Sequence, residues 1–133
     1  MTGEGKVPPM SVPAPERRTV VLIEDNLFLR AKIEGALAEA GYRPRCVTAP
    51  DTLRAALGGQ PLIVLVNLAA RAPWEALVAL VREQGAVPVV GYGPHTDEAL
   101  LARGRAAGCT EVVPNGLVAG NPGAVVVRHG RSR

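Results

Sequence analysis

Short runs of apolar, often β-branched residues alternate along the chain with segments in which apolar residues recur at helical spacing. The clearest runs, residues 19–23 and 62–66, are continuous in the way that is typical of strands buried on both faces of a parallel sheet. Weaker strands are predicted at residues 43–48, 87–90 and 110–113. Helices are predicted between them, at residues 27–40, 51–57, 74–81 and 96–107. This alternation predicts an α/β fold, a flavodoxin-like doubly wound sheet of five parallel strands.

The pattern is weakest at the end of the chain. Asn121 and Pro122 suit the first positions of a helix, but three consecutive valines at 125–127 are poor helix formers. Residues 121–129 are therefore predicted as either a short, irregular last helix or an edge strand. The predicted boundaries are a flexible, Pro- and Gly-rich N-terminal tail at 1–18, a domain at 19–129 and a basic C-terminal tail at 130–133.

Composition argues against several functional classes. Of 133 residues, 47% are hydrophobic, which excludes a disordered chain, and no apolar run approaches the ~20 residues of a membrane span. Only 3% are aromatic, too few for a surface that stacks nucleic-acid bases. Two cysteines make no disulfide framework, so Cys46 and Cys109 are predicted to be free thiols and the localisation to be cytoplasmic.

The formal charge of +3 lies at the ends of the chain. Residues 19–116 contain nine Lys or Arg and ten Asp or Glu, so the basic excess falls in the segments that precede and follow them. A body without a basic stripe does not favour nucleic acid as a partner.

Two carboxylates follow the first predicted strand, where sheets of this class bind ligands. Glu24 and Asp25 are adjacent, and each must be hydrated, paired or metal-bound. They could hold Mg²⁺ through oxygen ligands. Alternatively, Asp25 or Asn26 caps the next helix while Glu24 faces solvent. In either case, their negative charge and the lack of a Gly-rich motif argue against a phosphate-binding first loop.

The sequence resembles the receiver domains of response regulators from about residue 19 to 116. The resemblance is carried by the acidic pair, by the order of the strands and by the stretch Ala-Gly-Cys-Thr-Glu-Val-Val at residues 107–113. In that family the acidic pair and a phosphorylatable Asp bind Mg²⁺, while a Ser or Thr and a Lys contact the phosphoryl group. The resemblance therefore implies a function in two-component signal transduction.

Only the acidic pair, Glu24 and Asp25, matches that chemistry residue by residue. Asn67 stands at the position of the phosphorylatable Asp, and Gly93 stands at the position of the Ser or Thr. Asn115 stands at the position of the Lys, and Val112 at the position of an aromatic switch residue. An amide supplies no carboxylate nucleophile, and without the hydroxyl and the cation the phosphoryl group loses its electrostatic stabilisation. The sequence predicts a pseudo-receiver that is not an enzyme, has no catalytic residue and requires no cofactor, with at most weak Mg²⁺ binding at Glu24 and Asp25.

The predicted function is that of a stand-alone signalling module that acts by phosphorylation-independent protein–protein interaction. Receivers commonly bind partners through their fourth helix, fifth strand and fifth helix, and a short last helix would leave apolar side chains there uncovered. These side chains are Leu100, Leu101, Val112 and Leu117. The expected partner is a protein of a signalling pathway or a second copy of the chain, and not a membrane.

Two other functions stay open. One is a conventional phosphorelay response regulator with an unorthodox acceptor. The other is a flavodoxin-like domain that binds a small molecule or cofactor through the glycine loop at residues 91–94. Near the same mouth, Arg71 either reaches the carboxylates in place of a metal or is solvated, and His95 is either a ligand or simply exposed.

Overall fold

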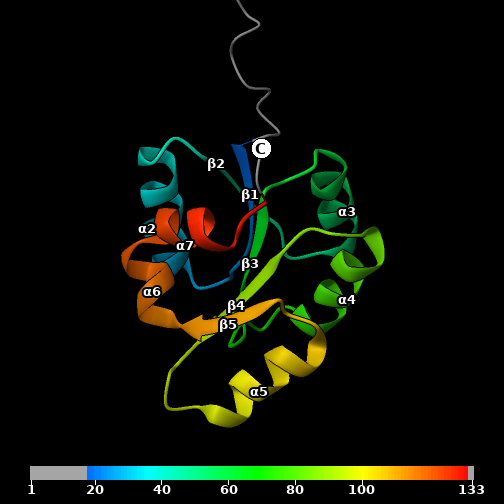
Figure 1. Ribbon diagram of the computed structural model, residues 1–133, viewed down its shortest axis with the longest axis vertical. Coiled ribbons are helices and arrows are strands. Elements are labelled where there is room, and N and C mark those ends of the chain that lie inside the picture. The colour runs from blue at the N-terminus through cyan, green and yellow to red at the C-terminus, as the bar shows by residue number, and fades with distance from the viewer. Residues whose placement is uncertain (1–17, 132–133) are drawn as a thin grey trace, which may run out of the picture.

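A single five-stranded sheet forms the centre of the computed structural model, which describes residues 18–131 (Figure 1). Its strands are β1 (Thr19–Ile23), β2 (Arg43–Cys46), β3 (Ile63–Asn67), β4 (Val89–Gly93) and β5 (Glu111–Pro114). They lie in the order β2-β1-β3-β4-β5 and all pairs are parallel. The predicted flavodoxin-like α/β fold is confirmed. The predicted N-terminal tail, apart from Arg18, and the last two residues of the C-terminal tail lie outside the described residues.

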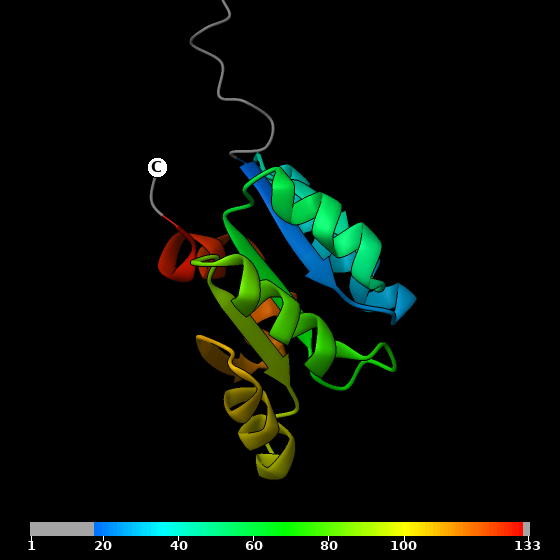
Figure 2. The ribbon, with the colours of Figure 1, turned by 90° about the vertical axis from the view of Figure 1, so that its right-hand side faces the viewer.

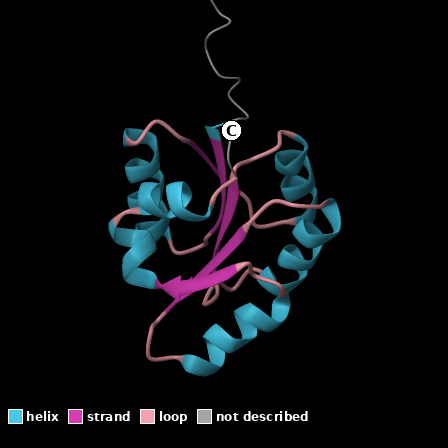
Figure 3. Ribbon diagram, viewed as in Figure 1, coloured by secondary structure: helices cyan, strands magenta, loops and turns pink. Residues whose placement is uncertain are grey.

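Helices cover both faces of the sheet (Figures 2 and 3). They are α2 (Leu27–Glu39), α3 (Pro50–Gly58), α4 (Trp74–Gln84), α5 (Glu98–Ala107), α6 (Asn115–Gly120) and α7 (Pro122–His129). Alternate residues of each buried strand point to opposite faces. Val21 and Ile23 therefore belong to a core with α3, α4 and α5, whereas Val20 and Leu22 belong to a core with α2, α6 and α7. None of the helices within residues 18–131 is long and apolar enough to cross a membrane.

The end of the chain is helical, which decides between the two structures predicted for residues 121–129. The Asn121 side chain accepts a hydrogen bond from the Ala124 amide and so caps α7, and Pro122 occupies its first turn. Val125 and Val126 are buried in the core beside α2, whereas Val127 is exposed. Burial of the two valines outweighs their low helix propensity. The short helix that precedes α7, α6, was not predicted from the sequence.

Strand β4 corrects the predicted glycine loop. It extends to Gly93, so residues 91–93 are buried within the sheet and do not form a ligand-binding loop. An ideal Cβ at Gly91 would lie 2.9 Å from Leu68 Cδ2 and 3.1 Å from Cys109 Sγ. The glycine therefore serves close packing against neighbouring side chains, which short sequence patterns do not distinguish from a turn.

Candidate functional site

Glu24, the residue after β1, points into the protein. Its side chain is 1% exposed, and three donors satisfy its carboxylate. Oε2 accepts from Asn67 Nδ2 at 2.7 Å and from the Asn26 amide at 3.0 Å, and Oε1 accepts from the Tyr92 hydroxyl at 2.6 Å. A carboxylate that only accepts hydrogen bonds matches this set of donors. The alternative in which Glu24 faces solvent is therefore wrong, and of the two candidate caps of α2 it is Asn26 that accepts from the Leu29 amide.

Asn67 ends β3 and has a fixed amide orientation. Its Oδ1 accepts from the Ala69 amide at 2.8 Å, so its Nδ2 is the group directed at Glu24. Only this orientation satisfies both ends of the amide, because the carboxylate offers no proton. The face that Asn67 turns to the acidic pair is therefore a hydrogen-bond donor and not an oxygen ligand.

Tyr92, on β4, completes the cluster and was not among the predicted site residues. It is fully buried. Burial raises the pKa of its phenol, and the hydrogen bond to Glu24 raises it further, so the hydroxyl stays protonated and remains a donor. One sequence signal pointed to it: a tyrosine inside an otherwise apolar strand needs a partner for its hydroxyl. We call Glu24, Asn67 and Tyr92 the Glu24 cluster; it ties together the ends of three neighbouring strands.

Replacing Tyr92 with Phe tests the weight of this hydroxyl. The variant leaves one oxygen of a buried carboxylate without its donor, so we expect the free energy of unfolding to fall by about 2 kcal/mol. Urea denaturation monitored by circular dichroism measures the change. Tyr42→Phe is the matched control, because Tyr42 is only half-buried. Equal stability of the two variants would contradict the assigned role of the Tyr92 hydroxyl.

Asp25 points the other way, into the loop that follows β3. Its Oδ2 accepts from the backbone amides of Arg71 at 2.8 Å and Ala72 at 3.0 Å. Arg71 therefore meets the acidic pair through its main chain, while its guanidinium forms no ion pair with the residues that the structure describes. An open, polar cavity of about 460 Å³ lies here, lined by Asp25, Asn26, Asn67, Ala69 and Arg71.

These atoms do not suit a hard cation such as Mg²⁺, which needs several free oxygen ligands. Both oxygens of Glu24 already accept hydrogen bonds, Asn67 turns an N–H toward them, and one oxygen of Asp25 holds two amides. Within residues 18–131, no group of three or more His, Cys, Asp or Glu side chains could hold a metal ion.

Comparisons with known proteins identify the architecture. Neither protein-family profiles nor curated proteins match the sequence. Solved structures match well. The receiver domain of NtrX from Brucella abortus is 20% identical, with a TM-score of 0.67, over 82% of this chain and 95% of that chain. The receiver domain of the TMAO respiratory response regulator TorR is 19% identical, with a TM-score of 0.67, over 84% of this chain and 92% of that chain. The chemotaxis protein CheY4 of Vibrio cholerae is 17% identical, with a TM-score of 0.69, over 84% of this chain and 98% of that chain.

The chain has the receiver-domain fold of two-component response regulators. It spans only 26% of a longer NtrX chain from Brucella abortus, with a TM-score of 0.68. Its likeness is therefore to the receiver domain and not to the whole regulator.

Two further receiver positions lie near the same edge of the sheet but do not bond to the Glu24 cluster. An ideal Cβ at Gly93 would lie 3.5 Å from Cδ2 of both Leu100 and Leu101. The two leucines of α5 thus pack over the place where the receiver resemblance expects a hydroxyl. Asn115 begins α6, and its Oδ1 is buried without a hydrogen-bond partner in the described part of the chain.

The four residues predicted as one exposed interaction face are divided between the two sides of the receiver fold. Leu100, Leu101 and Val112 are partly buried and pack against the core beneath α3, α4 and α5. Leu117 is 55% exposed and lies on α6, which covers the opposite face. The reason is the alternation along β5, where Val112 and Val113 point to opposite faces of the sheet.

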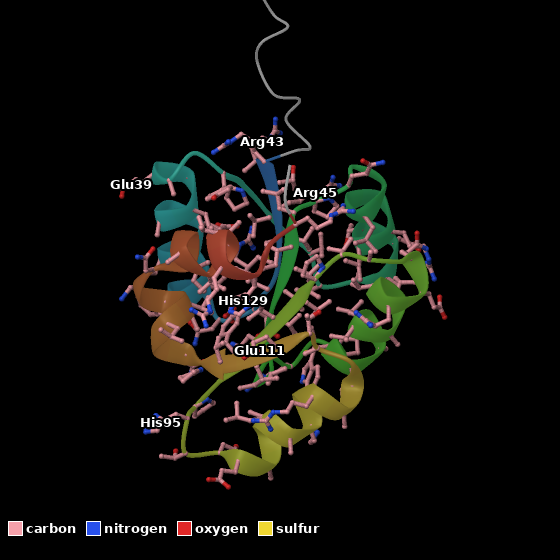
Figure 4. The ribbon with its side chains drawn as sticks, in the orientation of Figure 1. Glu39, Arg43, Arg45, His95, Glu111 and His129 are labelled. Atoms are coloured by element: carbon pink, nitrogen blue, oxygen red, sulfur yellow. The ribbon has the colours of Figure 1, made fainter. Side chains whose placement is uncertain are left out.

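Leu117 instead borders a groove of about 430 Å³ between β5 and α7, which we call the β5–α7 groove. Its apolar lining is Val113, Leu117, Ala124 and Val125, and its polar lining is Glu111, Asn121, Arg128 and His129. Figure 4 shows Glu111 and His129 in this region and His95 on the separate loop that leads to α5. His95 is exposed.

Both cysteines are free and half-buried. Burial raises the pKa of the Cys46 thiol, and burial raises that of Cys109 to about 11. Cys46 Sγ donates to the main-chain oxygen of Glu24 at 3.3 Å. Thiols with raised pKa values are poor nucleophiles at neutral pH, so neither residue adds a reactive group to the site.

Proposed function

We propose that this domain is a pseudo-receiver that acts in two-component-type signal transduction by phosphorylation-independent protein–protein interaction. The observation that carries the proposal is the hydrogen bond from Asn67 Nδ2 to Glu24 Oε2. At the position of a phosphoacceptor carboxylate, the domain presents an amide whose N–H donor is already bonded to the acidic pair.

Phosphoryl transfer would need a nucleophile and a cationic surrounding, and neither is supplied here. The nitrogen of a carboxamide is not nucleophilic, and its oxygen accepts from the Ala69 amide. Gly93 brings no hydroxyl, and Asn115 brings no cation. An unorthodox acceptor finds no support either, because Glu24 is buried and Asp25 holds two backbone amides.

The hydrogen bonds of the Glu24 cluster take the place of a metal ion in this proposal. Three donors compensate the buried carboxylate without a divalent cation, so in this proposal the domain requires no Mg²⁺. Because the same bonds join β1, β3 and β4, the cluster holds the carboxyl ends of these strands in one arrangement.

Incubation with acetyl phosphate and Mg²⁺ followed by intact mass spectrometry tests the proposal. We expect the mass to stay unchanged over hours, while a phosphorylatable receiver domain treated in parallel gains one phosphoryl group. A gain of one phosphoryl group on this chain would refute the proposal, and fragmentation would then locate the acceptor.

The partner in this proposal is a protein of a signalling pathway, and its place of binding is the β5–α7 groove. The groove combines apolar side chains with one cationic side chain, Arg128, and one anionic side chain, Glu111, and this lining suits an apolar protein segment that carries charged residues of both signs. The exposed Leu117 at its rim would add apolar contact area.

A further inference from the structure

Helix α2 has an outer face that nothing in the described chain covers. Its inner residues, Ile33 and Leu37, are buried in the core. On the outside, Leu27 is 76% exposed and Phe28, the only phenylalanine of the 133 residues, is 92% exposed. A surface helix normally carries polar residues opposite its buried stripe. The first turn of this helix therefore carries large apolar side chains on its outer side as well, which indicates that this side contacts another molecule.

The exposed residues of this outer face are spaced for contact with another helix. They form three pairs seven residues apart: Phe28 and Gly35, Ala31 and Ala38, and Lys32 and Glu39. Seven residues are about two helical turns, so each pair lies in one row along the helix. The row of Phe28 and Gly35 lies between the other two rows. At Gly35 an added Cβ would meet nothing within 4 Å. A partner backbone can therefore approach closely at this glycine.

We propose that two copies of the chain associate through α2, packed antiparallel with the Gly35 of one copy opposite the Gly35 of the other. The contact is isologous, because the same surface serves both copies. Antiparallel packing also places the positive end of each helix dipole beside the negative end of the other.

Charge complementarity selects a second copy as the occupant. Lys32 lies about 4.5 Å before Gly35 along the helix and Glu39 about 6 Å after it, at 1.5 Å per residue. In the antiparallel pair, Lys32 of one copy therefore lies within about 1.5 Å, along the axis, of Glu39 of the other. Neither residue forms an ion pair with another described residue, and Glu39 points outward from the end of α2 (Figure 4). The two-fold axis creates two such ion pairs.

The other two rows supply the apolar part of the contact. Ala31 of one copy meets Ala38 of the other, and small side chains there allow the close approach that Gly35 requires. Phe28 lies at each end of the pairing, about 4.5 Å along the axis beyond Glu39 of the other copy, where it faces the turn at residues 40–42 that follows the partner helix. None of these residues belongs to the Glu24 cluster or to the β5–α7 groove, so the dimer stands or falls independently of the proposed function.

Sedimentation over a concentration series tests the dimer with charge reversals. A seam of less than two heptads is small, so we expect a reversible dimer that is populated between about 0.05 and 1 mM, in the range of weak contacts. Lys32→Glu places like charges opposite each other and is expected to weaken the dimer at least about tenfold, as should Glu39→Lys. The double variant carrying both changes restores opposite charges and is expected to regain the dimer.

A glycine variant separates the contact from folding. Gly35→Gln favours the helix, because glycine is a poor helix former, yet its side chain fills the line of closest approach. We expect loss of the dimer with an unchanged or raised melting temperature. Gly58→Gln on α3 is the matched control, since a Cβ there also meets nothing, and it should leave the dimer intact.

Three results would overturn the proposal. The first is a purely monomeric wild-type chain at about 1 mM. The second is a dimer that survives Gly35→Gln and both single charge reversals. The third is a dimer lost in Leu117→Ser but not in Lys32→Glu, which would place the interface at the β5–α7 groove.

Discussion

Replacing Asn67 with Asp is expected to lower the free energy of unfolding at pH 7 by about 3–5 kcal/mol, although this change recreates the residue expected of a receiver. The substituted group lies 2.7 Å from a carboxylate oxygen that is buried with it. The variant exchanges a donor for a second negative charge at this distance, and the introduced carboxylate would also compete with Glu24 for the remaining donors. Chemical denaturation at several pH values measures the loss.

The loss in the Asn67→Asp variant should depend on pH. Repulsion raises the pKa of one carboxyl in the folded variant above the unfolded value of about 4. The folded state then binds a proton that the unfolded state has released, so the loss is small below about pH 4 and grows as the pH rises. A loss that does not change between pH 4 and 8 would contradict repulsion as the cause.

Magnesium provides a second measurement on the same variant. Three neighbouring carboxylates are a set of hard oxygen ligands, so excess Mg²⁺ is expected to raise the melting temperature of Asn67→Asp by about 5 °C or more. The wild-type chain, in which the amide N–H faces Glu24, should show no comparable rise. An equal rise in both proteins would show that the native acidic pair binds the cation, against the proposed function.

Replacing Glu24 with Ala is the second change with a large expected effect, a loss of about 3–4 kcal/mol. The variant removes the common acceptor of the Glu24 cluster and leaves the Tyr92 hydroxyl and Asn67 Nδ2 buried without their partner. It also opens a cavity at a side chain that is 1% exposed. Urea denaturation measures the change in the free energy of unfolding. Asp25→Ala is the matched control, and it should lower this free energy much less, because Asp25 is exposed.

The conservative variant Glu24→Gln distinguishes the acceptor from the charge. Its amide oxygen can still accept from Asn67, and its amide group can donate to the Tyr92 oxygen, because a hydroxyl both donates and accepts. We expect it to keep more than half of the stability that Glu24→Ala loses. If Gln is as damaging as Ala, the negative charge itself, and not the pattern of hydrogen bonds, stabilises the site.

Local sequence pattern was sufficient for the architecture. Continuous apolar runs such as residues 62–66 predicted buried parallel strands, and the sheet confirms them. Local sequence pattern was insufficient at residues 91–93, where glycines that permit close packing resembled a loop. It was also insufficient at Val125 and Val126, where tertiary burial outweighed a low helix propensity. The supposed interaction face also failed as one surface, because its members alternate across the sheet.

The sequence by itself determined which residues meet at the carboxyl edge of the sheet. Glu24, Asp25 and Asn67 each follow or end a recognisable strand, and parallel strands bring their ends to one edge. Only the tertiary structure decided that Glu24 turns inward and that the amide of Asn67 donates to it. The two side chains that donate to Glu24, Asn67 and Tyr92, are 43 and 68 residues away along the chain. A buried carboxylate takes its orientation from the donors around it, and here those donors come together only when the strands pair.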